Sequence, residues 1–314
     1  MSAAPRTLVA LVGATATGKS DLGEAVAAAV GGEVVCADAR QVFRELELGT
    51  GKPSPADRAR RPHHLCDALT LRERPTAGWF ARQARAVCED AFARGVTPVL
   101  VGGSGLYVRA LLEGLHEEPP QDLALRARLH EELAAEGPEA LHARLAAVDP
   151  ETAARLAPRD RQRVTRALEV HAASGRPLSW WHAHARREPF EADARLLEVT
   201  APAGRLAERI HARTRAMFAA GLVAEVRGLV AAGLAEPLRA LHAIGYDEAL
   251  AVLEEGLAED AAVAQVDQRT RQLAKRQRTW FRHQVRAPAV AADGREPGEV
   301  LAEALAALRL TPRP

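Results

Sequence analysis

The sequence predicts an α/β protein in which helices flank a parallel sheet and an all-helical segment interrupts the chain. Three observations lead to this prediction. Short apolar runs alternate with helical stretches, a glycine-rich motif joins the first run to the first helix, and residues 115–189 contain no convincing strand. Alternating strands and helices are typical of parallel sheets whose strands are joined by crossover helices.

The strands and helices are expected in a regular order. The apolar runs that we interpret as strands are 7–13, 33–38, 97–103 and 195–201. Helices are expected up to residue 30, over 77–94, around 203–233 and around 258–286. We therefore expect an α/β catalytic core with C-terminal helices from residues 1–115 and 195–314, and a helical insertion domain from residues 116–194.

The composition is that of a globular protein. Of the 314 residues, 47% are hydrophobic and 26% charged, so the chain can bury a core without disulfide staples. No apolar run approaches the ~20 residues of a membrane helix, and the N-terminus has no Lys/Arg-led apolar region ending in a cleavage site. Cys36, Cys66 and Cys88 form no CxxC pair. We expect a cytoplasmic monomer with no membrane segment.

The basic residues are divided unevenly between arginine and lysine. The net charge is only +1, and of 42 basic residues three are lysines: Lys19, Lys52 and Lys275. The planar guanidinium of arginine does not replace a compact ammonium at every kind of site. Each lysine is therefore a candidate for a site that needs a compact ammonium. The alternative is that these three positions are lysine by chance.

Residues 13–20 read GATATGKS and match the phosphate-binding pattern G-x-x-x-x-G-K-[ST]. An apolar strand precedes the motif and a helix follows it, as a P-loop requires. Its glycines let backbone N–H groups surround phosphate oxygens, its lysine neutralises them, and its serine can hold Mg²⁺. The sheet is thus predicted to be P-loop NTPase-like, with Mg²⁺ as cofactor and Ser20 as its ligand. The expected diphosphate site is Gly13, Ala14, Thr15, Ala16, Thr17, Gly18, Lys19 and Ser20.

One acidic residue is placed to act on a ligand of this loop. P-loop hydrolases usually carry an Asp at the end of a later strand, but the third strand ends in VLVGGSG, and no NKxD motif occurs. Asp38 instead follows the second strand. The carboxyl ends of parallel strands line the ligand crevice, so Asp38 is expected to be a general base or Mg²⁺ ligand there. A helix cap or turn residue is the alternative.

Six motifs in this order resemble the tRNA dimethylallyltransferase family, which modifies the adenosine next to the anticodon. The resemblance covers about residues 9–286 and includes all three lysines. The motifs are GATATGKS (13–20), ADARQVFRELELGTGKP (37–53), HHLCD (63–67), VGGSGLY (101–107), DRQRVTRALEV (160–170) and RQLAKRQRTW (271–280).

The resemblance implies a prenyl transfer reaction. Dimethylallyl diphosphate would bind in the P-loop, and the exocyclic amine of the adenosine 3′ to the anticodon would attack the allylic carbon and release diphosphate. Asp38 matches the family's general base, and Arg213 matches the arginine that stabilises the leaving diphosphate. Ser104 lies where the family usually has a threonine beside the reacting centre.

The resemblance also implies that tRNA is the partner and that the helical insertion grips its anticodon stem-loop. The residues implied to contact tRNA are Asp38, Ala39, Arg40, Gln41, Ser104, Arg126, Gln162, Arg163, Arg166, Lys275, Arg276, Arg278 and Arg282.

Three residues depart from the family pattern. Ala14 replaces a proline, Ala39 a serine and Phe43 a tyrosine. Ser104 keeps the hydroxyl of the usual threonine, so we expect the chemistry to be retained. Ala39 lacks a hydrogen-bonding group, which puts one contact to the base or backbone in question.

Two arginine-rich stretches predict RNA binding independently of the resemblance. Residues 155–187 contain eight arginines and two acids, and residues 269–286 contain six arginines, one lysine and no acid. A one-sided cationic stripe is typical of proteins that bind a phosphate backbone; a solvated helix face is the alternative. At helical spacing, the second stretch places four cations on one face: Arg271, Lys275, Arg278 and Arg282.

Three clusters have both a functional and a structural interpretation. Helical aromatics usually pack in a core, although some stack on RNA bases, and a single His/Cys cluster is weak evidence for a metal site. The clusters are Trp280 with Phe281; Trp180, Trp181, His182 and His184; and His63, His64 and Cys66.

Two other functions compete with prenyl transfer. A small-molecule kinase would bind ATP and release ADP in the presence of its acceptor. In a non-enzymatic RNA-binding module, Asp38 and Arg213 would be dispensable while RNA affinity persisted.

Overall fold

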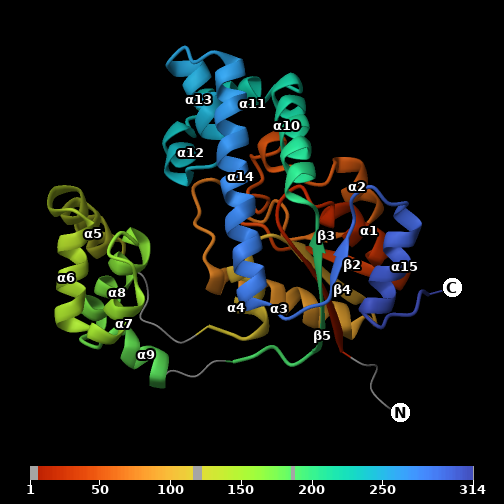
Figure 1. The fold of residues 1–314 in the computed structure, drawn as a ribbon, viewed down its shortest axis with the longest axis horizontal. Helices are drawn as coiled ribbons and strands as arrows, with labels where there is room; N and C mark the ends of the chain where they lie inside the picture. The colour runs from red at the N-terminus through yellow and green to blue at the C-terminus, as the bar shows by residue number, and fades with distance from the viewer. Residues whose placement is uncertain (1–5, 116–121, 185–187, 314) are drawn as a thin grey trace. The chain divides into compact units, whose positions relative to one another are not determined.

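The structure, a computed structural model, describes residues 6–115, 122–184 and 188–313 (Figure 1). The chain divides into two compact units, one of Met1–Leu112 with Phe190–Pro314 and one of Glu113–Pro189. The insertion was expected to span residues 116–194, so its predicted C-terminal boundary lies five residues beyond that of the second unit. Phe190 instead packs in the core of the first unit, and a strand begins at Asp193. Residues 116–121 and 185–187 of the expected insertion lie outside the described residues.

The first unit is built on a six-stranded parallel sheet, which confirms the predicted fold class. Its strand order is β3-β2-β4-β1-β5-β6, and each pair of neighbours is parallel. The strands β3 and β6, which are only two and three residues long, were not predicted. The strands are β1 (Thr7–Val12), β2 (Gly32–Cys36), β3 (His63–His64), β4 (Thr97–Gly102), β5 (Asp193–Thr200) and β6 (Ala289–Ala291).

Helices cover both faces of this sheet. Val9 and Leu11 of β1 face α1 and α15, whereas Leu8 and Ala10 face α3 and α4. All four side chains are fully buried, which explains why β1 is a continuous apolar run rather than an alternating pattern. The helices are α1 (Lys19–Val30), α3 (Ala77–Ala93), α4 (Gly105–Leu112) and α15 (Pro297–Ala307).

Helices of the C-terminal half gather beyond the carboxyl ends of the strands (Figure 1). The helix expected over 203–233 is two helices, because the chain turns at Gly221, where φ is +101°. Phe43 and Leu46, from the segment after β2, pack in the core of this group. The helices are α10 (Ala203–Ala219), α11 (Leu222–Ala231), α12 (Ala235–Leu241), α13 (Tyr246–Glu254) and α14 (Glu259–Gln284).

The segment after β2 contains two short helices, η1 (Leu48–Thr50) and α2 (Pro55–Arg60). Ser54 caps α2 through a reciprocal pair of hydrogen bonds with Asp57.

The second unit contains only helices among its described residues. Leu141, Leu145 and Val170 are fully buried in its own apolar core. In the part of the whole chain that the structure describes, no helix is both long and apolar enough to cross a bilayer. The helices of the unit are α5 (Leu123–Glu136), α6 (Pro138–Val148), α7 (Pro150–Arg155), α8 (Arg161–Ser174) and α9 (Leu178–His184).

Candidate active site

The phosphate loop joins β1 to α1, and two of its glycines have backbone conformations that other residues rarely adopt. The φ angle is +151° at Gly13 and +88° at Gly18. A Cβ atom at Gly13 would also lie 2.4 Å from the carbonyl oxygen of Val199 in β5. Glycine is therefore needed at position 13 both for its conformation and for this close approach. The loop ends with Lys19 and Ser20 in the first turn of α1.

Lys19 folds back over the loop. Its Nζ donates to the carbonyl oxygen of Ala14 at 3.1 Å, and Thr17 Oγ1 donates to the same oxygen at 3.0 Å. Burial lowers the pKa of Lys19 to about 8; the Asp38 carboxylate opposes this shift and Arg213 adds to it. Lys19 therefore remains mostly cationic at neutral pH.

Arg213 of α10 lies against the same loop. Its Nη1 donates to Thr15 Oγ1 at 3.3 Å, and its Nη2 donates to the carbonyl oxygen of Thr50 at 3.1 Å. Burial lowers the pKa of Arg213, although the guanidinium stays charged. An anion in the loop would thus meet two cations, Lys19 and Arg213.

Asp38 lies two residues beyond the end of β2, in a tight turn. Its Oδ1 accepts hydrogen bonds from the backbone N–H of Arg40 at 2.8 Å and of Gln41 at 3.4 Å. Its Oδ2 accepts no hydrogen bond from any residue that the structure describes. Asp38 is therefore a turn residue through one oxygen, and the other oxygen is available to accept a proton from a ligand.

The loop between β4 and α4 places Ser104 beside this turn. Ser104 Oγ accepts a hydrogen bond from the Ala39 N–H at 3.1 Å, and Ser104 N donates to the carbonyl oxygen of Ala37 at 3.2 Å. The Ala39 side chain packs, partly buried, against apolar residues. Because the bond to Ser104 uses the backbone N–H of residue 39, alanine at this position preserves it. The Ser104 hydroxyl can still donate its own hydrogen to another group.

One cleft of the first unit, of about 1040 Å³, brings most of the predicted residues together. The other four residues of the phosphate loop shape it but do not line the cleft: Gly13, Ala14, Thr17 and Gly18. Of the tRNA contacts predicted on α14, Arg276 lines the cleft. The predicted residues in the lining are Thr15, Ala16, Lys19, Ser20, Asp38, Ala39, Arg40, Gln41, Ser104, Arg213 and Arg276.

Arg40 and Gln41 also hold the walls of the cleft. Arg40 Nη2 donates to the carbonyl oxygen of Leu241 at 2.9 Å, and Gln41 Nε2 donates to that of Gly51 at 3.1 Å. Burial lowers the pKa of Arg40, and the nearby Asp38 carboxylate opposes this shift. Both side chains are therefore already engaged with the protein at the edge of the cleft.

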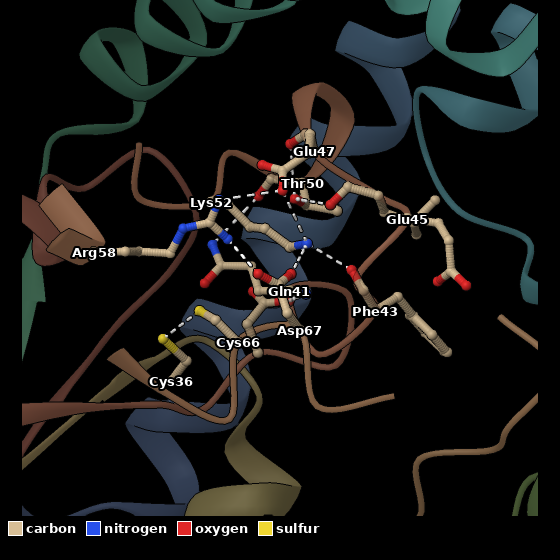
Figure 2. A network of polar contacts seen from close by, with 12 residues as sticks. Cys36, Gln41, Phe43, Glu45, Glu47, Thr50, Lys52, Arg58, Cys66 and Asp67 are labelled. Atoms are coloured by element: carbon tan, nitrogen blue, oxygen red, sulfur yellow. Dashed lines mark hydrogen bonds and ion pairs between the residues drawn. The ribbon is translucent and has the colours of Figure 1, made fainter. Parts of the chain in front are cut away.

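Lys52 anchors the segment that forms one wall of the cleft (Figure 2). Its side chain is 1% exposed, and it forms an ion pair with Asp67. Its Nζ also donates to the carbonyl oxygen of Phe43 at 2.6 Å and lies 3.7 Å from Glu47. A compact ammonium can satisfy several acceptors around one point, which a planar guanidinium cannot do equally well. This lysine is thus retained for the architecture of the wall.

The HHLCD segment is held by protein groups. His63 Nε2 lies 2.7 Å from Glu24 Oε1, and His64 likewise contacts a glutamate. Cys66 Sγ lies 2.8 Å from Cys36 Sγ (Figure 2); this hydrogen bond and burial raise the pKa of Cys36. Within the described ranges, no group of three or more His, Cys, Asp or Glu residues could hold a metal ion. These contacts favour the structural interpretation of the cluster.

The predicted cationic stripe lies on α14. Arg271, Lys275 and Arg282 are exposed, and Arg278 is half-buried. None of the four pairs with an acidic residue of the described chain, whereas Arg269 pairs with Asp247 and Glu248. Burial raises the pKa of Glu198 and the charge of Arg282 opposes this shift, so one acid lies near the stripe without forming an ion pair with it. The stripe is therefore a largely unpaired cationic surface.

In the second unit, two of the predicted tRNA contacts hold a buried carboxylate. Glu169 is fully buried, with Arg126 at 3.1 Å and Arg166 at 3.0 Å. Gln162 and Arg163 are exposed at the start of α8. Two further arginines of the predicted stretch, at positions 186 and 187, lie outside the described residues.

The aromatic clusters differ in burial. Phe281 is fully buried and Trp280 packs beside it, with ring centroids 5.1 Å apart, so this pair belongs to the core. Trp180 stacks on His184 at 4.6 Å, and Trp181 Nε1 donates to Ser174 Oγ at 3.2 Å. Stacking of this second cluster on RNA bases stays a prediction.

Two residues at the phosphate loop were not singled out from the sequence. Arg209 Nη1 donates to the carbonyl oxygen of Ala16 at 3.4 Å, and its Nη2 lies 2.8 Å from Asp293. Gln277 reaches the loop from α14. Gln277 lies inside the motif RQLAKRQRTW (271–280), whereas Arg209 lies outside the six motifs, and only the fold shows that both face the loop.

Comparisons with known proteins agree with this geometry. A family model described as IPP transferase matches residues 41–284, and one described as isopentenyl transferase matches residues 6–67. A tRNA dimethylallyltransferase of Halorhodospira halophila is 46% identical over 299 residues, which cover 93% of this chain and 95% of the relative.

Two solved structures have similar folds. The full-length tRNA isopentenylpyrophosphate transferase of Bacillus halodurans is 29% identical, with a TM-score of 0.69 and 97% of both chains covered. A eukaryotic dimethylallyltransferase, described as acting on tRNA, is 25% identical, with a TM-score of 0.74 over 88% of this chain and 69% of that one. These matches confirm the resemblance that the motifs indicated: the chain belongs to the IPP transferase family, the tRNA dimethylallyltransferases.

Proposed function

We propose that this chain transfers the dimethylallyl group of dimethylallyl diphosphate to the exocyclic amine of the adenosine 3′ to the anticodon of tRNA, and releases diphosphate. The observation that carries the proposal is the content of one cleft. A phosphate loop with two cations lies there with a carboxylate that has one free oxygen. The first part binds a diphosphate, and the second can remove a proton from a nucleophile.

Both parts of the donor, the diphosphate and the apolar tail, would find matching groups in the cleft. Its diphosphate would contact Lys19, Arg213 and the N–H groups of the P-loop. The cleft is also lined by three apolar side chains of α10, Ile210, Met217 and Phe218, which suit a branched five-carbon tail. As the C–O bond breaks, Lys19 and Arg213 would stabilise the charge that develops on the departing diphosphate.

Asp38 would act on the acceptor. The adenine amine is a weak nucleophile because its lone pair is delocalised into the ring, and it must lose a proton as the new N–C bond forms. Asp38 Oδ2 would take that proton while Oδ1 stays bound to the turn. Ser104, which is hydrogen-bonded to the same turn, would orient the amine or the donor. To reach these groups the base must leave its stack, at a cost of a few kcal/mol.

Mg²⁺ would accompany the diphosphate. Ser20 is exposed at the start of α1 and lines the cleft, and the described residues offer no cluster of three carboxylates or imidazoles. That donor set fits a magnesium ion held by one hydroxyl, by phosphate oxygens and by water. The ion would neutralise charge on the diphosphate.

The tRNA would bind through cationic surfaces of both units. The stripe on α14 would contact the phosphate backbone, and the helical insertion would grip the anticodon stem-loop, with Gln162 and Arg163 at its exposed surface. The three free cysteines support work in a reducing compartment, the cytoplasm.

The deciding experiment is mass spectrometry of nucleosides from unmodified tRNA incubated with the protein, Mg²⁺ and dimethylallyl diphosphate. We expect a dimethylallyl adenosine at one position and an equal amount of diphosphate, without ATP. A parallel reaction contains ATP in place of dimethylallyl diphosphate. If the tRNA stays unmodified in both reactions while ATP is converted to ADP in the second, the proposal is wrong and a kinase is favoured.

A further inference from the structure

The side-chain amide of Gln277 joins two loops of the cleft. Its Oε1 accepts a hydrogen bond from the backbone N–H of Thr15 at 2.8 Å, and its Nε2 donates to the carbonyl oxygen of Gly103 at 3.0 Å. A backbone N–H can only donate and a carbonyl oxygen can only accept, so these two partners determine which way the amide is turned. A carboxylate has no hydrogen to donate to Gly103, and an apolar side chain could form neither hydrogen bond.

The helix that carries Gln277 is seated against the glycines of the VGGSGLY motif. A Cβ atom at Gly103 would lie 2.5 Å from Gln277 Nε2, and one at Gly105 would lie 2.2 Å from Trp280 Cε3. Gln277 and Trp280 are three residues apart and therefore lie on the same face of α14. The two glycines thus make room for two side chains of α14, which sets the amide at a fixed place between the loops.

The second of these loops also supports the proposed base. Ser104 follows Gly103; its Oγ accepts from the Ala39 N–H, and its own N–H donates to Ala37. A path of hydrogen bonds, joined by the Gly103–Ser104 peptide link, therefore runs from the phosphate loop through Gln277 to the residues on either side of Asp38. Among the described residues, Gln277 is the side chain that links the phosphate loop, where the prenyl donor would bind, to the loop that supports Asp38.

We propose that Gln277 is a positioning residue for the transfer reaction, which keeps the diphosphate in the phosphate loop in register with the Asp38 carboxylate. This inference rests on the proposed function. Reacting groups must meet within a narrow range of distance and angle, and a displacement of about 1 Å can cost on the order of 100-fold in rate. Gln277 lines the cleft, but both polar atoms of its amide are bound to the two loops, so its loss should lower the rate of transfer more than it weakens tRNA binding.

The test compares Gln277→Ala with the wild-type enzyme in single-turnover transfer at saturating donor and tRNA. The rate is normalised to the number of tRNA-binding sites, so that an unfolded fraction does not count. We expect a rate lower by roughly 10–100-fold, with the KM for tRNA within about threefold of wild type. Wild-type turnover in Gln277→Ala would overturn the inference. A wild-type enzyme that modifies no tRNA would count against the proposed function instead.

Gln277→Glu provides a readout that a merely structural role would not produce. The carboxylate can still accept from Thr15 but faces the Gly103 oxygen without a hydrogen to donate. A protonated Glu could donate again, so the rate relative to wild type at the same pH should rise as the pH is lowered. A ratio that does not change with pH would contradict the bridging role. Gln284→Glu is the matched control, since Gln284 is exposed on the same helix and should show a flat ratio near one.

A double-mutant cycle keeps the inference testable if the single variants lose stability. Gln277 is proposed to act through the loop of Ser104. The rate losses caused by Ser104→Ala and by Gln277→Ala should therefore not be independent of each other. The double variant should be slowed by less than the product of the two single effects. Independent, multiplying effects would show that Gln277 does not act through this loop.

Discussion

The two arginine-rich regions of this chain, residues 155–187 and 269–286, share a high arginine content but differ in how their charges are paired. On α14, Arg271, Lys275 and Arg282 are exposed and form no ion pair within the described residues. In the helical unit, Arg155 pairs with Glu151 and Arg159 with Glu139. Arg126 and Arg166 there hold the buried Glu169. Counting charges along the sequence predicted RNA binding for both regions alike.

The difference shows that an anion-binding surface depends on where the acids are in space. Two of the acidic partners in the helical unit lie outside the counted stretch 155–187: Glu139 pairs with Arg159 from 20 positions away, and Glu151 pairs with Arg155. A count over the stretch alone therefore overstates its free positive charge. Exposed ion pairs are weak, and those of the helical unit can be exchanged for phosphate contacts. The α14 stripe needs no such exchange. We therefore expect α14 to contribute more to the salt-dependent part of tRNA binding.

The largest effect is expected at the buried carboxylate of the helical unit, Glu169. Glu169→Ala would leave Arg126 and Arg166 without their carboxylate and should destabilise the helical unit by about 3 kcal/mol, at the lower end for a broken buried pair because both arginines are partly exposed. Denaturant unfolding of the full chain, with hydrogen exchange in α5 and α8, would measure it. Glu139→Ala removes an exposed pair and should cost no more than about 1 kcal/mol. Equal losses would mean that the buried carboxylate has no special role.

The next effect separates chemistry from both binding regions. Asp38→Asn should slow transfer by at least ~100-fold, because an amide cannot take the proton of the amine. The affinity for tRNA should stay close to that of wild type, since α14 and the helical unit are unchanged. Single-turnover rates and filter binding on the same samples would measure both quantities. Turnover within about tenfold of wild type, together with lost donor binding, would assign Asp38 to metal binding or structure instead.

A pH effect of about one order of magnitude is expected at the phosphate loop. Lys19 has a pKa of about 8 because it is buried, so it loses its charge as the pH rises through that value. Binding of the donor diphosphate should therefore weaken above pH 8, by up to about tenfold per pH unit. Calorimetric titration with dimethylallyl diphosphate between pH 6.5 and 9.5 would show it. Lys19→Met should bind weakly, with no such decline; a decline that persists in this variant would come from another group.

The smallest effect addresses the comparison most directly. Replacing Arg278 and Arg282 with Gln should lower the log–log salt slope of tRNA binding by about one unit per residue. Arg155→Gln with Arg159→Gln, in the helical unit, is the matched control and should lower it by less, because each arginine already has an acidic partner. Titrations at several salt concentrations would give both slopes. Equal changes in the two double variants would show that α14 and the helical unit contribute alike to the salt dependence of tRNA binding.

Much of the fold could be predicted because its signals are local. The apolar runs of β1, β2 and β4 and the P-loop between β1 and α1 are each contained in a few consecutive residues. Short elements were missed for the opposite reason. A strand of two residues such as β3 has no periodicity of its own and exists because Val34 and Val35 pair with it. The break at Gly221 was missed because the helical pattern continues on both sides of it.

The sequence by itself determined the chemistry of the site, because GATATGKS and the position of Asp38 after a strand specify a phosphate loop and a nearby carboxylate. Tertiary structure decided which other side chains reach them. Lys52 became a buried anchor of the wall, Arg126 and Arg166 became partners of Glu169, and Gln277 became the link between two loops. The physical reason is distance along the chain. Gln277 and Thr15 are 262 positions apart, and only the packing of α14 across the phosphate loop brings an amide to a backbone N–H.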